Sequence, residues 1–311
     1  MLKTDSYQCP KSLLELAESL SPTPTAIVGA HGTLPMKSAK LAQEQNLISP
    51  VFVGNRVAIL KLAEELHWDI SLERIVHAET DRDSADVAAA LAGNGEVAAL
   101  MKGQIHTDEF MHGILQRDAG LRTDRRLTHI FHMTLPEHNN SLMITDGAVN
   151  VAPSIDTRLQ AAQHAIELSH MLGNNNPKVA VLSGTESPIK SMPSSIEAAE
   201  ITRRAVNEIS GGQVFGPLAF DNAISTKAAN LKKINHPVAG NADILLVPNI
   251  ETGNALFKMM VYFMSACAAG IVLGANVPIT LTSRADPPEA RVASAALANI
   301  VAHVGKASKG K

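Results

Sequence analysis

The chain has 311 residues, of which 45% are hydrophobic, so it is long and apolar enough for two domains with ordinary cores. A formal net charge of −3 argues against general nucleic-acid binding. The two cysteines are too few for a disulfide framework or a cysteine-based metal site.

The first half of the chain alternates between strand-like and helix-like patterns. Strands are predicted at 25–30, 50–53, 74–77 and 96–101, and helices at 35–45, 56–66, 84–91 and 107–116. This repetition predicts a parallel sheet with helices on both faces.

A polar, basic and turn-rich stretch at 117–126 interrupts the alternation. We interpret it as the crossover into a second domain, with a basic loop inside one domain as the alternative. The predicted domains are 1–126 plus 286–311, and 127–285.

The second half resumes the alternation. Strands are predicted at 127–133, 141–145, 178–182, 213–218, 244–247 and 277–282, and helices at 158–172 and 194–208 and after 285. The apolar run 255–275 is near the length of a membrane span, but it contains Lys258 and ends near two glycines. We therefore predict a buried helix that runs into a buried strand. With no signal-peptide pattern at the N-terminus, the expected location is the cytoplasm.

The stretch from the last predicted strand into the C-terminal helix carries a candidate anion site. Ser283 and Arg284 fall between the strand end and the helix N-terminus, where backbone N–H groups and the helix dipole favour an anion. Asp286 fits an N-cap, Pro287 the first helical position, and Glu289 a capping box. Capping alone also explains both acidic residues.

Three further loops each follow a predicted strand, at the edge where open α/β sheets collect ligands. Their candidate binding residues are Asp146, Asn150, Asp221, Asn222, Asn249 and Asn254. Asp, Asn and Gly are also favoured in turns, so a purely structural role is the alternative. The acidic group of Asp81, Asp83 and Asp86 fits helix capping better than a metal, and no metal site is predicted.

Taken together, six collinear segments resemble the phosphate acetyl/butyryltransferase family, and the butyryl branch more closely. They are MKGQIHTDEFMHGIL (101–115), GLRTDRRLTH (120–129), ITDGAVNVAPS (144–154), FGPLAFDNAIS (215–225), LLVPNIETGNALFK (245–258) and LTSRADPPEA (281–290).

The resemblance implies a two-domain, three-layer α/β/α fold of isocitrate-dehydrogenase-like architecture with mostly parallel sheets and an active site in the interdomain cleft, as a homodimer. It implies reversible transfer of a short acyl group between coenzyme A and inorganic phosphate in a ternary complex, with coenzyme A as substrate and no bound cofactor. Ser283 and Arg284 match the family's serine–arginine pair.

Two positions depart from the family pattern. Ala290 stands where the acetyltransferases carry a catalytic aspartate, which makes Glu289 the candidate thiol base. His112 stands where the family carries an arginine that contacts substrate phosphate, and it is a weaker donor at neutral pH. These departures leave two alternatives to the enzyme: a non-catalytic CoA- or acyl-phosphate-binding homologue, and an isocitrate-dehydrogenase-like oxidoreductase.

Overall fold

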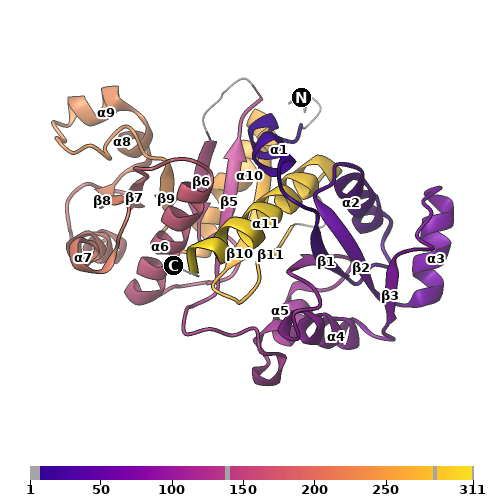
Figure 1. Ribbon diagram of the computed structural model, residues 1–311. Helices are drawn as coiled ribbons and strands as arrows, with labels where there is room; N and C mark the ends of the chain where they lie inside the picture. The colour runs from indigo at the N-terminus through magenta and orange to yellow at the C-terminus, as the bar shows by residue number, and fades with distance from the viewer. Residues whose placement is uncertain (1–7, 137–140, 283–285, 310–311) are drawn as a thin grey trace. The chain divides into compact units, whose positions relative to one another are not determined.

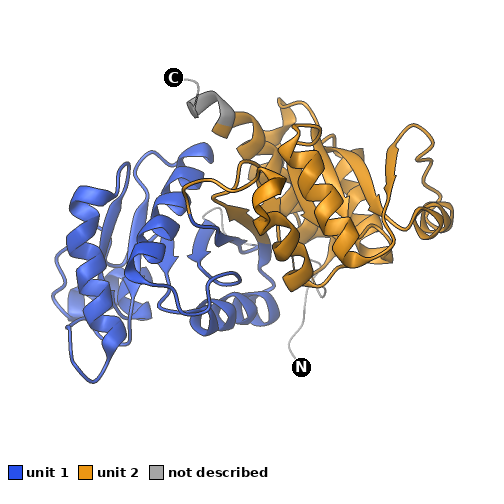
Figure 2. Ribbon diagram, turned by 90° about the horizontal axis from the view of Figure 1, so that it is seen from below, with its two compact units in different colours: residues 1–6, 126–268 blue, residues 7–125, 269–311 orange. Residues whose placement is uncertain are grey.

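The computed structural model describes residues 8–136, 141–282 and 286–309. By their contacts these residues form two compact units, shown in Figure 2: the described residues of 126–268 form unit 1, and those of 8–125 and 269–309 form unit 2. The predicted domains, 1–126 with 286–311 and 127–285, stay a prediction. The two units are groups of residues in mutual contact, and such a grouping does not test where one domain ends and the next begins.

The sheet of unit 2 has the strand order β3-β2-β1-β4-β11-β10. Its strands are β1 (Thr23–Val28), β2 (Ile48–Gly54), β3 (Arg74–His77), β4 (Ala99–Lys102), β10 (Cys267–Leu273) and β11 (Ile279–Thr280). The first four and β11 are parallel, whereas β10 and β11 pair antiparallel. Strand β11 has only two residues, fewer than the strand predicted at 277–282. Pro278 has no N–H for the ladder, although its carbonyl still accepts from the N–H of Leu100 at 3.1 Å.

Helices cover both faces of this sheet (Figure 1). They are α1 (Lys11–Glu18), α2 (Thr33–Glu44), α3 (Arg56–Glu65), α4 (Asp81–Gly93), α5 (Thr107–Leu115), the short 3-10 turn η1 (Arg117–Ala119) and α11 (Pro288–Lys309). Helix α11 packs on α1, α2, β4 and β11, and α4 packs on α5, β1, β2 and β4. The buried Asn299 anchors α11, because its side-chain amide donates to the carbonyl oxygens of Ser21 and Leu47, both at 2.9 Å.

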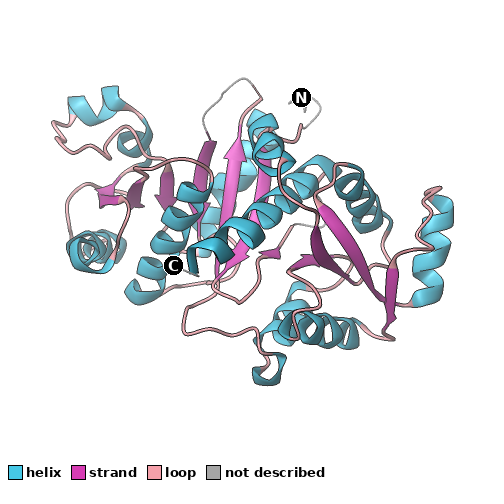
Figure 3. Ribbon diagram, viewed as in Figure 1, coloured by secondary structure: helices cyan, strands magenta, loops and turns pink. Residues whose placement is uncertain are grey.

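The sheet of unit 1 has the order β5-β6-β9-β7-β8. Its strands are β5 (Thr128–Thr134), β6 (Ser141–Thr145), β7 (Lys178–Leu182), β8 (Gln213–Leu218) and β9 (Ile244–Leu246). Strands β5 and β6 are antiparallel, and β6, β9, β7 and β8 run parallel to one another. Both units therefore have the predicted mostly parallel α/β architecture (Figure 3).

Two residues of β5 show that the sheet of unit 1 is covered on both faces. Thr128 lies 2.7 Å from His164 of α6 (Ile155–Met171), whereas Phe131 stacks on Phe257 of α10 (Ile250–Met264) with ring centroids 4.0 Å apart. Side chains three positions apart on a strand point to opposite faces. Helix α7 (Pro193–Glu208) packs beside α6.

One segment near these helices differs from the sequence prediction, and another agrees with it. The short helices α8 (Phe220–Ile224) and α9 (Thr226–Leu231) follow β8, where the sequence indicated only a loop. The apolar run 255–275 forms α10 followed by β10, as predicted. In the described part of the chain, every helix is too short or too polar to cross a membrane.

Candidate active site

The carboxyl ends of β1, β4 and β11 lie at one edge of the sheet of unit 2, because these strands are parallel neighbours. The loops that follow β1 and β4 touch backbone to backbone. The N–H of Gly103 donates to the carbonyl of Val28 at 2.8 Å, and a Cβ on Gly103 would lie 2.5 Å from the carbonyl oxygen of Gly29. Only glycine allows this close approach.

The predicted serine–arginine pair follows β11 in the chain. Ser283 and Arg284 lie outside the described residues, and their roles stay predictions. The residues on either side, Thr282 and Asp286, are each only 7% exposed. Strand β11 therefore brings the chain to the same edge of the sheet as the loops after β1 and β4.

Helix α11 begins one residue later than the sequence predicted. Its first residue is Pro288, and the carbonyl of Pro287 accepts the N–H of Arg291 at 3.4 Å, so Pro287 holds the N-cap position. The assignment of Asp286 as the N-cap was wrong. A residue that precedes a proline is disfavoured from the helical region, and Pro288 therefore keeps Pro287 outside the helix.

The candidate base Glu289 lies in the first turn of α11 and is half-buried. Burial, and to a lesser degree the carboxylate of Glu289, raise the pKa of the Cys9 thiol to about 12. The carboxylate therefore lies near Cys9, the residue that precedes α1 by two positions. Ala290, at the family's aspartate position, is 2% exposed and packs inside the unit.

Arg291 is a buried cation that the sequence did not single out. It is 4% exposed, burial lowers the pKa of its guanidinium, and the carboxylate of Asp286 opposes that shift. Asp286 therefore compensates a buried charge. The sequence did contain a signal for this buried charge, because a single arginine lies on the apolar face of an alanine-rich helix.

The predicted phosphate contact His112 is exposed on α5. Its Nε2 lies 3.1 Å from Nη2 of Arg82, and the same guanidinium reaches Asp86 at 3.2 Å and Glu109 at 3.5 Å. A guanidinium can only donate, so His112 Nε2 accepts in this contact. Only Nδ1–H then remains to donate to a ligand.

The carboxyl ends of β6, β9, β7 and β8 form a second edge, in unit 1. The loops after β6 and β9 lie against each other, as expected for neighbouring parallel strands. A Cβ on Gly253 would lie 2.8 Å from the Cα of Gly147, and the N–H of Ile250 donates to the carbonyl of Val151 at 3.0 Å.

Asp146 organises the loop after β6. It is 3% exposed, and its carboxylate accepts four hydrogen bonds. The donors are the N–H groups of His129 (3.1 Å), Ala148 (3.0 Å) and Val149 (2.9 Å) and the side-chain amide of Asn150 (2.6 Å). Asn150 also donates to the carbonyl of Leu127 at 2.8 Å. The structure brings this predicted pair together, and the pair shapes the loop.

The predicted residue Asn249 caps helix α10. Its Oδ1 accepts from the N–H of Thr252 at 2.9 Å and from the Thr252 hydroxyl at 2.7 Å. Asn254 lies further along the same helix and is half-buried. The structure therefore places these two residues at the same edge as Asp146, with Asn249 in a capping role.

Asp221 and Asn222 lie in the segment after β8, and their environments differ. Asp221 is exposed, whereas Asn222 is fully buried and its amide donates to Glu186 in the loop after β7. Lys232 reaches the same carboxylate oxygen at 2.6 Å. Glu186, which the sequence did not indicate, therefore links the loops after two neighbouring strands.

His132 is a buried histidine of unit 1. It lies inside β5 in register with Met143, and burial lowers its pKa to about 4. The histidine is therefore neutral near pH 7 and a weak base. Burial on a sheet face is a tertiary property that the strand pattern does not specify.

Of the three acidic residues at the start of α4, Asp83 serves in the capping box, whereas Asp86 pairs with Arg82. Asp83 Oδ2 accepts from the N–H of Thr80 at 3.2 Å, and the Thr80 hydroxyl accepts from the N–H of Asp83 at 3.1 Å. Across the described ranges, no three His, Cys, Asp or Glu side chains are grouped to bind a metal ion.

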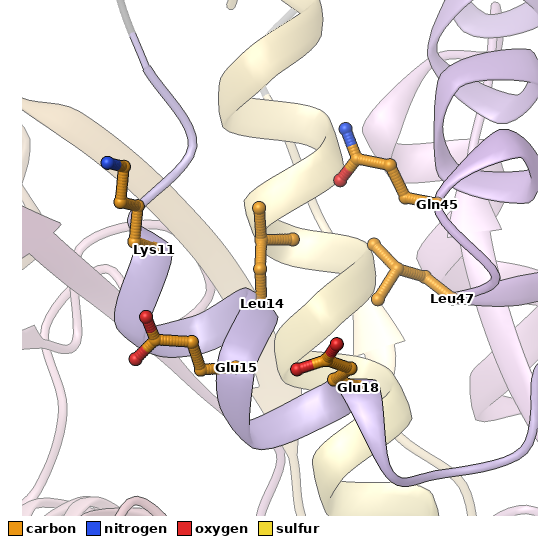
Figure 4. A pocket seen from close by; sticks show the side chains of 6 residues that line it. All are labelled: Lys11, Leu14, Glu15, Glu18, Gln45 and Leu47. Atoms are coloured by element: carbon orange, nitrogen blue, oxygen red, sulfur yellow. The ribbon is translucent and has the colours of Figure 1, made fainter.

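A pocket of about 370 Å³ lies at α1 (Figure 4). It is lined by Lys11, Leu14, Glu15, Glu18, Gln45 and Leu47. Because Gln45 and Leu47 precede β2, the pocket lies at the amino end of that strand. It is therefore away from the edge of the sheet that the carboxyl ends of β1, β4 and β11 form. No predicted site residue lines it.

Comparison with known proteins agrees with this geometry. The family model "Phosphate acetyl/butaryl transferase" matches residues 79–299. The chain is 42% identical over 291 residues to a protein named phosphate acetyltransferase from Rhizobium meliloti, covering 93% of this chain and 92% of the relative. It is 33% identical over 296 residues to a phosphate butyryltransferase from Clostridium beijerinckii, covering 94% of this chain and 98% of the relative. Of these two relatives, the acetyltransferase has the higher sequence identity, so this comparison does not favour the predicted closeness to the butyryl branch.

A solved structure gives the same result. A branched-chain phosphotransacylase from Enterococcus faecalis V583 superposes with a TM-score of 0.78 at 31% identity, covering 90% of this chain and 99% of that one. The chain therefore belongs to the phosphate acetyl/butyryltransferase family of acyltransferases. The oxidoreductase alternative finds no support in these matches.

Proposed function

We propose that this protein catalyses the reversible transfer of a short acyl group between coenzyme A and inorganic phosphate. The observation that carries the proposal is the 42% identity to a phosphate acetyltransferase over 93% of the chain. The glycine-lined carboxyl edge of unit 2 supports it, because such an edge is the usual ligand site of an open α/β sheet.

The reaction needs a thiolate nucleophile and a stabilised phosphate leaving group. A base removes the thiol proton of coenzyme A, and the sulfur attacks the carbonyl carbon of the acyl phosphate. The bond from that carbon to the phosphate oxygen breaks, and its electron pair leaves with the phosphate. We assign the base to Glu289 and the binding of phosphate to Ser283 and Arg284. Coenzyme A acts as substrate, and no bound cofactor takes part.

The remaining predicted residues receive binding or shaping roles. Asp146, Asn150 and Asn249 fix the conformations of the loops after β6 and β9, and through these loops they define a substrate surface. The other assigned substrate-binding residues are His112, Asp221, Asn222 and Asn254.

We further propose that the protein works as a homodimer. The last turns of α10 expose Met259, Tyr262, Phe263 and Met264 by 42%, 52%, 65% and 45%. Contiguous large apolar side chains on a helix face mark an interaction surface, and a symmetric dimer buries one such patch against its own copy. The free cysteines fit a reducing cytoplasm as the place of action.

The test is a turnover assay with the purified full chain. Acetyl-, propionyl- and butyryl-CoA are mixed in turn with inorganic phosphate, and thiol release is followed with a chromogenic thiol reagent. We expect release that depends on phosphate, and the three rates identify the preferred chain length. Binding of coenzyme A without turnover would favour the non-catalytic alternative.

A further inference from the structure

The pocket at α1 is a cavity of unit 2 that the proposed function does not use. Its volume of about 370 Å³ lies within the ordinary range of small-molecule pockets. One wall is a single face of α1, because its residues are spaced at i, i+3, i+4 and i+7. These residues are Lys11, Leu14, Glu15 and Glu18. The opposite wall is the turn between α2 and β2, where the side chains of Gln45 and Leu47 point toward α1 (Figure 4).

Both walls of the pocket are anchored to the same helix, α11. The side-chain amide of Asn299 donates to the carbonyl of Leu47 in one wall and to that of Ser21, three residues after α1, both at 2.9 Å. Helix α1 packs on α11, and its residues Leu13 and Ala17 are 1% and 2% exposed. The two walls are therefore held in place without a ligand, and this lowers the entropic cost of binding one.

The polar side chains of the pocket are available to a ligand. Among the described residues, none of the four forms a side-chain hydrogen bond or an ion pair; they are Lys11, Glu15, Glu18 and Gln45. Lys11 and Glu15 lie one helical turn apart, at the spacing where opposite charges often pair, yet these two side chains are not within ion-pair distance. The pocket therefore offers both an ammonium group and carboxylates for recognition.

A ligand that matches this lining has a positive group and a negative group close together, beside an apolar body. The carboxylates of Glu15 and Glu18 suit an ammonium group, and the Lys11 ammonium suits a carboxylate. One turn of helix, about 5.4 Å, separates Lys11 from Glu15, so the two complementary groups of the ligand must be neighbours. Leu14 and Leu47 supply the apolar wall, and in Figure 4 Leu47 lies at the end of the pocket opposite to Lys11 and Glu15.

We propose that the pocket at α1 binds a free α-amino acid with an aliphatic side chain. Lys11 binds its carboxylate, Glu15 and Glu18 bind its ammonium group, and its side chain packs on Leu14 and Leu47. The pocket lies at the amino end of β2, whereas the substrates are assigned to the carboxyl ends of the strands. The amino acid is therefore a ligand additional to the substrates, and this inference does not rest on the proposed function.

The test is isothermal titration calorimetry of the full chain with three compounds of the same shape. L-Leucine carries both charged groups, 4-methylpentanoate lacks the ammonium group, and 3-methylbutylamine lacks the carboxylate. We expect L-leucine to bind with a Kd of about 1 mM or tighter. Each analogue should bind at least about tenfold more weakly, because it loses one charged contact. No saturable heat from L-leucine at about 10 mM, or an analogue that binds as tightly as L-leucine, would overturn the inference.

Lys11→Gln tests the site itself, with Lys61→Gln as the matched control. Both lysines are exposed on helices of unit 2, and Lys61, on α3, does not line the pocket. Lys11→Gln should weaken L-leucine about tenfold and leave 3-methylbutylamine unchanged, because only L-leucine has a carboxylate for Lys11. Lys61→Gln should bind both as the wild type does. A Lys11→Gln variant with wild-type affinity for L-leucine would place the amino acid elsewhere and overturn the inference.

Discussion

The side-chain amide of Asn150 donates to Asp146 Oδ2 at 2.6 Å, and this bond closes a loop in which one buried carboxylate satisfies four donors. Asp146→Ala would remove the acceptor that those four donors share, and of these the N–H of His129 belongs to a fully buried residue. We expect the free energy of unfolding to fall by about 2–4 kcal/mol. Urea titration measures the loss. The control Asp221→Ala removes an exposed carboxylate and should change stability by less than about 0.5 kcal/mol. Equal effects would show that Asp146 does not organise the loop.

Glu289→Gln tests the assignment of the thiol base. If Glu289 removes the thiol proton, turnover should fall about 100-fold or more, and the rising limb of the pH profile should vanish. Steady-state thiol release at several pH values gives both quantities. Near-normal turnover would place the base elsewhere. His132 is then a poor replacement, because its pKa of about 4 makes it a weak base.

The Cys9 thiol should be nearly inert in the native protein. Its pKa of about 12 leaves roughly one thiolate in 10⁴ molecules at pH 8, and the thiolate is the reactive form. The expected reaction with a chromogenic disulfide reagent is about 1,000-fold slower than that of a thiol of pKa 9.0. Unfolded protein should titrate both of its cysteines. Glu289→Gln should speed the reaction at Cys9, because it removes the second cause of the raised pKa. An unchanged rate would contradict the proximity of Glu289 and Cys9.

His132 should make the protein sensitive to acid. Its pKa is about 4 in the folded chain and near 6.5 in the unfolded chain, so the unfolded chain binds more protons between these values. Stability therefore falls as the pH drops through this window, by about 2 kcal/mol from pH 7 to pH 5 for this group. Urea titrations of wild type and His132→Gln at both pH values measure the contribution. An identical pH dependence in the two proteins would reject it.

The apolar end of α10 predicts the assembly state. Phe263→Glu places a charge on the side chain that is 65% exposed, at the centre of the proposed dimer surface. We expect sedimentation to show a dimer for wild type and a monomer for the variant, because an unpaired charge is costly to bury. Leu72→Glu, at an exposed position of unit 2, is the control and should remain dimeric. A dimeric Phe263→Glu would move the interface to another surface.

Much of the architecture followed from local patterns in the sequence. The strands 74–77, 178–182 and 213–218 were predicted with the bounds that the structure shows. Short apolar runs with flanking turn residues define such segments without long-range information. The short helices α8 and α9 were missed, because segments of five and six residues are too short to show a helical periodicity, and Asp221 and Asn222 in α8 are also typical of turns.

The sequence by itself determined the alternation of elements, the polar loops at strand ends and the family. Tertiary structure decided which of those polar side chains already form hydrogen bonds within the protein. Asp146 bonds within its own loop, Asn222 bonds to Glu186, and Asn249 bonds to the first turn of α10. It also decided that Lys102 is buried. Burial there depends on strand order, and β11 reaches β4 from far along the chain: the Thr280 hydroxyl donates to the carbonyl of Leu100 at 3.5 Å across 180 residues. Local patterns carry no information about pairings between such distant segments, because those pairings form only when the whole sheet assembles.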